Sequence, residues 1–196
     1  MTASLHRREV VKVLLRDRKD LLVVAGLGST AWDVTATGDS PLNFPLWGAM
    51  GNAAMIGLGL ALAQSARRVL VITGDGEMLM GLGSLATIGV RQPSNLSVVV
   101  IDNERYGETG MQATHTAGGV DLAKVALACG FGSARQVRAP GELARLRAAI
   151  HGTPGPHFAQ IKVVAEKLPL ALPPREGAVL KARFRRALLG EEADLA

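Results

Sequence analysis

Apolar side chains recur along the chain in short runs that are separated by polar and glycine-rich segments. Two of the runs, RVLVITG at 68–74 and LSVVVIDN at 96–103, are continuous rather than alternating. Continuous β-branched and aliphatic runs are typical of strands that helices cover on both faces of a sheet. The same composition predicts strands at 21–26, 134–139 and 157–164.

Segments with helix-like spacing of apolar residues lie between these runs. They predict helices near 50–64, 79–91, 121–129 and 141–150. Because strands alternate with helices, the sequence predicts an α/β fold: a doubly wound, mostly parallel sheet with helices on both faces and right-handed crossovers. In such sheets, functional atoms gather at the carboxyl ends of the strands.

The C-terminal segment VLKARFRRALLG predicts a helical extension at about 175–190. Its apolar residues Leu180, Phe184 and Leu188 follow at i, i+4 and i+8 and form one stripe, which we expect to dock on a partner or on the same domain. A basic helix that binds RNA or anionic lipid is the alternative, but the acidic EEAD that follows disfavours it.

Length and composition narrow the class of protein. The 196 residues show no break in composition, so we expect one domain over 1–196. The net charge of +5 comes from scattered basic residues, and aromatic residues make up only 4%, which disfavours nucleic-acid and membrane binding. Lys12 interrupts the apolar run of the N-terminal segment, so we expect an amphipathic helix there and no signal peptide. The single cysteine, Cys129, fits a reducing cytoplasm.

A glycine pattern follows the first predicted strand. Gly26, Gly28 and Ala31 match the dinucleotide-binding pattern G-x-G-x-x-A. That pattern needs a helix directly after it, and the next residues carry Gly38 and two prolines instead of helical periodicity. A dinucleotide-binding oxidoreductase therefore stays an alternative that the local sequence disfavours.

Two oxygen-bearing side chains end neighbouring predicted strands. Asp75, within Gly-Asp-Gly, ends one buried run, and Asn103 ends the next after about one helical crossover. We expect both at the same edge of the sheet, where hard oxygen ligands suit Mg²⁺ shared with phosphate oxygens. Gly74 and Gly76 allow close approach of the backbone to a diphosphate. The alternative is that Asp75 caps a helix and Asn103 turns the chain.

These motifs resemble a known family. The segment GDGEMLMGLGSLATIGVRQPSNLSVVVIDNERYG, together with WGAMGNAAMIGLGLALA, resembles the diphosphate-binding (PP) domain of enzymes that depend on thiamine diphosphate, also called thiamine pyrophosphate (TPP). With YGETGMQATHTAGG, the chain is most similar to the β subunits of sulfopyruvate decarboxylases and to the corresponding half of phosphonopyruvate decarboxylases. The resemblance implies the fold of that domain.

The resemblance also implies which residues hold the metal and the diphosphate. Asp75, the Asn103 side chain and the backbone carbonyl of Arg105 would bind Mg²⁺. Backbone groups at Gly76 and Glu77 would contact the diphosphate. Ser29 and the close approach at Gly74 would complete the phosphate site.

Other positions would bind the organic part of the cofactor or the substrate. Met50, a bulky aliphatic residue within the G-x-x-G element, would support the bent cofactor through its shape. The carbonyl of Gly48 would accept a hydrogen bond from the aminopyrimidine. Residues of the loop after the third strand are candidates for substrate contact, with His115 as a catalytic candidate: Gln112, Thr114 and His115.

Three positions depart from the family pattern. Glu77 stands where relatives often have a small residue, and its carboxylate would repel the diphosphate unless it points away. Asp102 replaces the first Asn of a common pair. Met111 stands where close relatives often have Gly. These departures affect the assignment of the substrate more than that of the cofactor.

The resemblance finally implies a partner and a reaction. In the family, the Glu that activates the cofactor lies on a separate pyrimidine-binding (Pyr) domain, so we expect a hetero-oligomer with a second chain that supplies it. The expected activity is that of a carboxy-lyase, most simply decarboxylation of sulfopyruvate to sulfoacetaldehyde and CO₂. Phosphonopyruvate or another 2-oxoacid as substrate, and a non-catalytic subunit that binds cofactor, remain alternatives.

Overall fold

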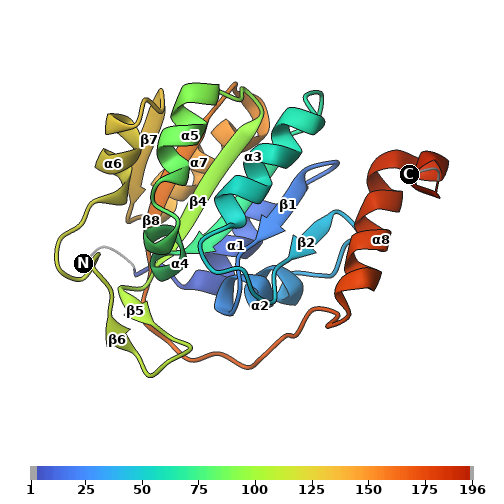
Figure 1. Ribbon diagram of the computed structural model, residues 1–196. Coiled ribbons are helices and arrows are strands. Elements are labelled where there is room, and N and C mark those ends of the chain that lie inside the picture. The colour runs from blue at the N-terminus through green and yellow to red at the C-terminus, as the bar shows by residue number, and fades with distance from the viewer. Residues whose placement is uncertain (1–3, 195–196) are drawn as a thin grey trace.

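The structure, a computed structural model, describes residues 4–194 and contains a six-stranded sheet in which all neighbouring strands are parallel. The strand order is β2-β1-β3-β4-β8-β7, and a separate antiparallel pair, β5-β6, follows β4 (Figure 1). The strands are β1 (Leu22–Ala25), β2 (Asn43–Pro45), β3 (Val69–Gly74), β4 (Leu96–Asp102), β5 (Arg105–Tyr106), β6 (Gln112–Ala113), β7 (Ser133–Val137) and β8 (His157–Lys162).

Helices cover both faces of the sheet, which confirms the predicted fold class. One buried cluster joins the sheet to α1, α2 and α7, and a second joins it to α3, α5 and α6. The helices are α1 (Arg7–Leu15), α2 (Ser29–Ala36), α3 (Ala53–Ala63), α4 (Asp75–Met80), α5 (Ser84–Arg91), α6 (Leu122–Ala128), α7 (Pro140–Gly152) and α8 (Gly177–Leu189), followed by a 3₁₀ turn at Gly190–Asp194. Within the described residues, no helix is both long and apolar enough to cross a bilayer.

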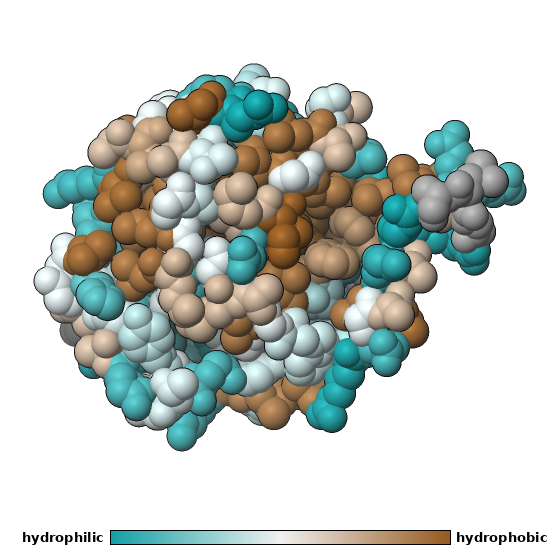
Figure 2. Space-filling view, viewed as in Figure 1, coloured by the Kyte–Doolittle hydropathy of each residue, from teal (hydrophilic) through white to brown (hydrophobic). Residues whose placement is uncertain are grey.

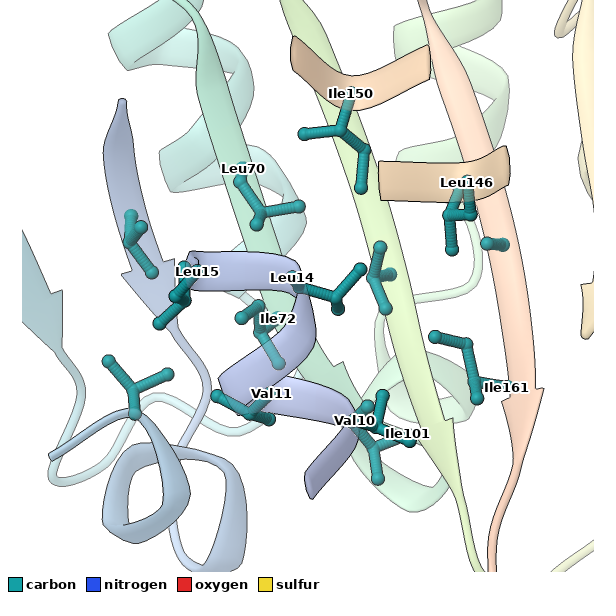
Figure 3. Packing of buried hydrophobic residues seen from close by; sticks show 14 of the residues in the cluster. Val10, Val11, Leu14, Leu15, Leu70, Ile72, Ile101, Leu146, Ile150 and Ile161 are labelled. Carbon is teal, nitrogen blue, oxygen red and sulfur yellow. The ribbon is translucent and has the colours of Figure 1, made fainter. Parts of the chain in front are cut away.

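The two core clusters follow from the alternation of side chains along each strand. On β3, Leu70 and Ile72 point to the cluster with α1 and α7, while Val69 and Val71 point to the cluster with α3. Figure 3 shows the first cluster, with Leu14 of α1 above the central strands. Since both faces of β3 and β4 are buried, apolar side chains are favoured at successive positions on these two strands, which explains the continuous hydrophobic runs.

The five predicted strands are confirmed to within a few residues, whereas β2 was not predicted. β2 carries a proline at its end and lies at the edge of the sheet, where a missing N–H is tolerated. The predicted helix at 79–91 is wrong in its bounds, because α4 begins at Asp75 and α5 only at Ser84. Gly81, between them, lies so close to the backbone of Gly51 that a Cβ would approach its carbonyl oxygen to 1.9 Å.

The turn after β1 corrects a second expectation. A helix does begin there, α2 at Ser29, and it ends before Gly38. The absence of a helix was therefore the wrong reason to doubt dinucleotide binding. Gly26 has instead a packing role, because a Cβ on this residue would lie 1.9 Å from Oε2 of Glu77. The first glycine of the pattern makes room for a buried carboxylate.

The C-terminal helix α8 docks on its own domain. Leu180 and Phe184 are buried, and the Phe184 ring packs against Phe44 of β2 with 5.2 Å between the ring centroids. Arg183 forms a salt bridge with Asp39, which precedes β2. α8 lies beside the edge strand (Figure 1). It thereby shields one edge of the sheet from pairing with other strands.

We predict that Gly26→Ala lowers the free energy of unfolding by about 2 kcal/mol, because the added methyl group overpacks against Glu77. Chemical denaturation measures the change. The cost should shrink by about 1 kcal/mol when Glu77→Ala is present in the same chain. Gly141→Ala in α7 is the control, since no heavy atom lies within 4 Å of the position of its Cβ. Equal costs at both glycines would contradict the packing role of Gly26.

Candidate functional site

A cavity lies at the carboxyl ends of β1, β3 and β4. The chain leaves β1 toward β2 on one side and leaves β3 toward β4 on the other, so the sheet reverses its winding between β1 and β3. Ligands of open α/β sheets bind in the crevice at such a point. The cavity is lined by the ends of these strands, by the first residues of α1, α2 and α4, and by the segments that follow β2 and β4: Arg7, Leu27, Ser29, Thr30, Met50, Gly74, Asp75, Gly76, Glu77, Ile101, Asn103, Arg105, Tyr106, Gly107, Glu108 and Thr109.

Asp75 occupies the centre of the predicted site. It follows β3 directly, is the first residue of α4 and is buried. Its Oδ2 accepts hydrogen bonds from Thr114 Oγ1 at 2.6 Å and from Thr116 Oγ1 at 3.2 Å. Burial, partly offset by these hydroxyls, raises the pKa of Asp75 to about 6, and the negative charge of Asp102 adds to the rise. A metal ion at this carboxylate would favour its ionised form.

Asp102 is fully buried at the end of β4 and is held on all sides. Its Oδ2 accepts from Gln160 Nε2 at 2.6 Å and from Lys162 Nζ at 2.8 Å, both on β8. Its Oδ1 accepts from Thr116 Oγ1 at 2.8 Å and from the backbone N–H of residue 104. Because the Lys162 charge compensates a buried carboxylate, Asp102 is a structural anchor in place of the expected Asn.

Thr116 joins the two carboxylates. Its hydroxyl lies within hydrogen-bond distance of Asp75 Oδ2 and Asp102 Oδ1 and also of Thr114 Oγ1. Both threonines belong to the loop after β6, so these bonds fix that loop to the ends of β3 and β4. Thr114, expected to contact substrate, is instead buried behind Asp75.

Asn103 lines the cavity beside Asp75, as predicted from the two strand ends. Its Oδ1 accepts a hydrogen bond from the Arg105 backbone N–H at 2.9 Å, which bends the chain into β5. An amide oxygen has two lone pairs, so one remains for a cation. Arg105 lines the same cavity, while its Nη1 donates to the carbonyl of residue 104.

Glu77 lines the cavity, but its carboxylate is turned toward Thr73 and Gly26, the orientation that a neighbouring diphosphate would require. Its Oε2 accepts from Thr73 Oγ1 at 2.8 Å, and the side chain is buried against Gly26. Burial raises the pKa of Glu77, although Thr73 and nearby backbone N–H groups, among them those of Gly51 and Ala53, act in the opposite direction. Oε1 nevertheless has no hydrogen bond of good geometry.

The G-x-x-G element reaches the cavity through one residue only. Met50 lines the cavity and is 37% exposed, so its side chain is available for contact with a ligand. Gly48 is exposed and is not part of the cavity wall. The preceding Trp47 is held by a hydrogen bond from its Nε1 to the Pro174 carbonyl at 2.8 Å. The backbone of Ala49 is left-handed, with φ at 59°.

The loop after β4 brings only some of its candidates to the site. His115 is exposed and lies outside the cavity wall, and Gln112 is exposed and bonded to Thr109. Met111 has a φ of 64°, a left-handed conformation that glycine adopts without strain. This explains physically why a glycine suits the position. Met111 lines a second hollow next to the first.

Among the residues of the site that sequence reasoning missed are three with polar contacts that matter to it: Arg7, Thr116 and Lys162. Lys162 had a usable signal, because a lysine that ends a buried strand needs an anionic partner on the next strand, and Asp102 pairs with it in the register of β4 and β8. No local sequence signal identified Arg7 or Thr116, since both lie on segments whose position depends on the tertiary structure.

The donor set fits a phosphate-bound cation better than a closed metal site. Among residues 4–194, no three His, Cys, Asp or Glu side chains cluster so as to hold an ion. One carboxylate, one amide oxygen and a carbonyl leave positions that phosphate oxygens would fill. A Cβ at Gly74 would meet no atom within 4 Å, so the backbone there is open to a ligand.

Comparison with known proteins agrees with this geometry. Residues 28–161 match the family described as thiamine pyrophosphate enzyme, C-terminal TPP binding domain. The chain is 43% identical over 127 residues to the sulfopyruvate decarboxylase subunit beta of Methanothermobacter thermautotrophicus, covering 65% of this chain and 68% of that subunit. It is 37% identical over 168 residues to the phosphonopyruvate decarboxylase of Streptomyces viridochromogenes, which covers 85% of this chain but only 42% of that enzyme.

Solved structures share the fold. Benzoylformate decarboxylase from Polynucleobacter necessarius superposes with a TM-score of 0.70 at 20% sequence identity, over 85% of this chain and 34% of that one. A thiamin diphosphate-dependent enzyme from Mycobacterium smegmatis superposes with a TM-score of 0.69 at 24% identity, over 84% and 33%. The chain therefore belongs to the thiamine pyrophosphate enzymes, through their C-terminal TPP-binding domain, and within them to the family of the sulfopyruvate decarboxylase β subunits.

Proposed function

We propose that this chain is the diphosphate-binding subunit of a TPP-dependent decarboxylase that converts sulfopyruvate to sulfoacetaldehyde and CO₂. The observation that carries the proposal is the convergence of Asp75, Asn103 and the first turn of α2 on one cavity at the point where the sheet reverses its winding. Several relatives at 40–45% identity are β subunits of sulfopyruvate decarboxylase, which supports this substrate.

In this proposal Asp75, Asn103 and the carbonyl of Arg105 hold Mg²⁺. Their oxygen atoms suit a hard cation, and the diphosphate supplies further oxygens. α4 begins at Asp75, so backbone groups at Gly76 and Glu77 belong to its first turn and are free to donate to phosphate. Gly74 keeps the approach open.

The remaining residues of the site orient the cofactor and exclude water. When bound, TPP supplies the electron sink that allows the carboxylate of a 2-oxoacid to leave as CO₂. Met50 at the cavity edge would support the bent cofactor by contact, and Ser29 would donate to the diphosphate from the first turn of α2. Gly48, Gln112 and His115 lie outside the cavity wall, so their roles in binding pyrimidine or substrate depend on a partner or on closure of the loop.

The proposal includes a second chain that carries the pyrimidine-binding domain and its activating Glu. Apolar residues are exposed along and beside α3, and Figure 2 shows apolar surface gathered over this region. They are Met50, Met55, Leu62 and Met80, with exposed fractions of 37–63%. An exposed apolar surface beside the cofactor cavity suits a stable protein partner. A cytoplasmic location belongs to the same proposal and fits the single free cysteine.

Two other functions keep specific support. Phosphonopyruvate decarboxylases match the chain at 37–41% identity, so a phosphonate in place of the sulfonate is the nearest alternative substrate. A non-catalytic subunit would bind TPP yet release no CO₂ from any 2-oxoacid when assembled with its partner. Measurement of CO₂ release from sulfopyruvate, phosphonopyruvate and pyruvate separates these outcomes.

The first test is calorimetric titration of TPP into this chain, assembled with its partner, with and without Mg²⁺. We expect Asp75→Asn to weaken Mg²⁺-dependent binding at least about tenfold, about 1.4 kcal/mol, because the metal loses its carboxylate. Glu108→Gln is the matched control, since Glu108 lines the same cavity without belonging to the proposed metal site. Binding that needs no Mg²⁺ and is insensitive to Asp75→Asn would refute the metal assignment.

A second prediction concerns pH. With the pKa of Asp75 raised to about 6, the carboxylate is protonated below that pH and must lose its proton to bind the metal. Mg²⁺-dependent TPP affinity should therefore fall toward about tenfold per pH unit below pH 6 and level off above it. Calorimetry in buffers of different ionisation enthalpy should detect proton release on binding near pH 5.5. In Asp75→Asn this proton release should disappear, and its persistence would show that another group titrates.

The third prediction concerns Thr116. Thr116→Val keeps the shape of the side chain but removes the hydroxyl between Asp75 and Asp102, which leaves two buried carboxylates with fewer donors. We expect a loss of about 1–3 kcal/mol in the free energy of unfolding, measured by denaturation, together with weaker Mg²⁺-dependent TPP binding. Thr35→Val is the control, because Thr35 lies outside the cavity wall and its hydroxyl donates to the Ala31 carbonyl within α2, so neither quantity should change by more than a small margin.

A further inference from the structure

A buried arginine from α1 reaches the cofactor cavity. Arg7 is the first residue of α1, is only 4% exposed and forms part of the cavity wall together with Ser29 and Asp75. It also borders the adjacent hollow, so its side chain lies at the junction of the two. A charged side chain at a ligand cavity is seldom this buried unless it is paired.

Among residues 4–194, Arg7 is paired through one of its nitrogen atoms, Nη1. Nη1 donates to Asp33 Oδ2 at 2.5 Å and to the backbone carbonyl of Ser29 at 3.1 Å. Arginine has further N–H donors on Nε and Nη2, and within the described part of the chain no hydrogen-bond partner takes them. Nε and Nη2 of Arg7 are not among the fully buried, unpartnered polar atoms of the described residues, so a ligand in the cavity can reach them.

The charge of Arg7 is not cancelled by Asp33. Arg8 also binds this carboxylate, through Nε to Oδ1 at 3.0 Å, so two guanidinium groups share one carboxylate and leave one positive charge. Arg8 has a second anchor, the carbonyl of Pro169, and does not line the cavity. Of these two arginines, Arg7 is the one that lines the cavity.

The cavity needs such a cation. Apart from Glu77, whose carboxylate is turned toward Gly26, the wall carries the carboxylates of Asp75 and Glu108 and the guanidinium groups of Arg7 and Arg105, and Arg105 is the more exposed of these two arginines. A diphosphate adds further negative charge, which one Mg²⁺ neutralises only in part. A nine-tenths buried guanidinium is well suited to phosphate because its planar donors match two phosphate oxygens.

The fold holds Arg7 rigidly in this place. Val10, Val11 and Leu14 of α1 are buried against the central strands (Figure 3), so the helix that carries Arg7 cannot shift without opening the core. The bond from Arg7 to the Ser29 carbonyl also ties it to the first turn of α2, whose free N–H groups attract the same kind of anion.

We propose that Arg7 binds the terminal phosphate of TPP through the donors that Asp33 leaves free, while Asp33 orients the guanidinium. This inference rests on the proposed TPP function and adds a phosphate-binding residue that comes from α1, outside the Gly-Asp-Gly and Asn elements. Ser29 and Arg7 then bind the phosphate from the side of α2, and the metal binds it from the side of α4.

The test compares TPP with thiamine monophosphate, which lacks the terminal phosphate, in calorimetric titrations of the assembled complex with Mg²⁺. We expect Arg7→Met to lower the preference for TPP over the monophosphate about tenfold or more, with little change in affinity for the monophosphate itself. Arg8→Met removes the other partner of Asp33 and should leave the preference within about twofold of the unaltered protein. Arg7→Lys, which keeps a charge beside Asp33 but loses the planar fork, should be intermediate.

The outcomes separate the two proposals. If Arg7→Met and Arg8→Met shift the preference equally, or if neither shifts it, Arg7 only neutralises Asp33 and the inference is overturned while TPP binding stands. If Arg7→Met does not fold, an unchanged preference in Arg7→Lys overturns the inference in the same way. If the unaltered complex binds no TPP, the proposed function fails and this inference fails with it.

Discussion

The fully buried carboxylate of Asp102 is the constraint on which the site depends. A buried charge must be compensated, and on β8 the Lys162 ammonium does this while the Gln160 amide donates a hydrogen bond to the same carboxylate oxygen. The hydroxyl of Thr116 lies within hydrogen-bond distance of both Asp102 and Asp75, so the position of one carboxylate depends on that of the other. The position of Asp75, directly after β3, is thus coupled to a strand two places away in the sheet, although the residues are far apart in the sequence.

Three layers of structure serve the same cavity. The sheet brings together the carboxyl ends of β1, β3 and β4. The core clusters on its two faces hold α1 and α4 in place. Thr114, in the loop after β6, donates a hydrogen bond to Asp75. Burial changes the properties of each polar group at the site. It raises the pKa of Asp75 and of Glu77, requires a partner for Asp102, and strengthens the ion pair between Arg7 and Asp33.

Glycines at the site act by allowing close approach rather than flexibility alone. Gly26 accommodates the inward-turned Glu77, and Gly81 lies against the backbone of Gly51 at the break between α4 and α5. The carboxylate of Glu77 is turned toward Gly26 and Thr73. A position that departs from the family pattern is thereby compatible with the family's cofactor.

The sequence by itself determined the order of the strands along the chain, the α/β class and the pair Asp75 and Asn103 at one sheet edge, because continuous apolar runs and strand-end polar residues are local signals. It did not determine β2, whose proline is tolerated because the strand lies at the edge of the sheet. It also did not determine the break between α4 and α5, where Gly81 lies against the backbone of Gly51, or the helix that begins at Ser29, because tertiary contacts override local propensity. Only the tertiary structure placed Arg7 and Thr116 in the site and His115 outside the cavity wall. Those placements depend on packing between segments that are distant in sequence, which no local pattern records.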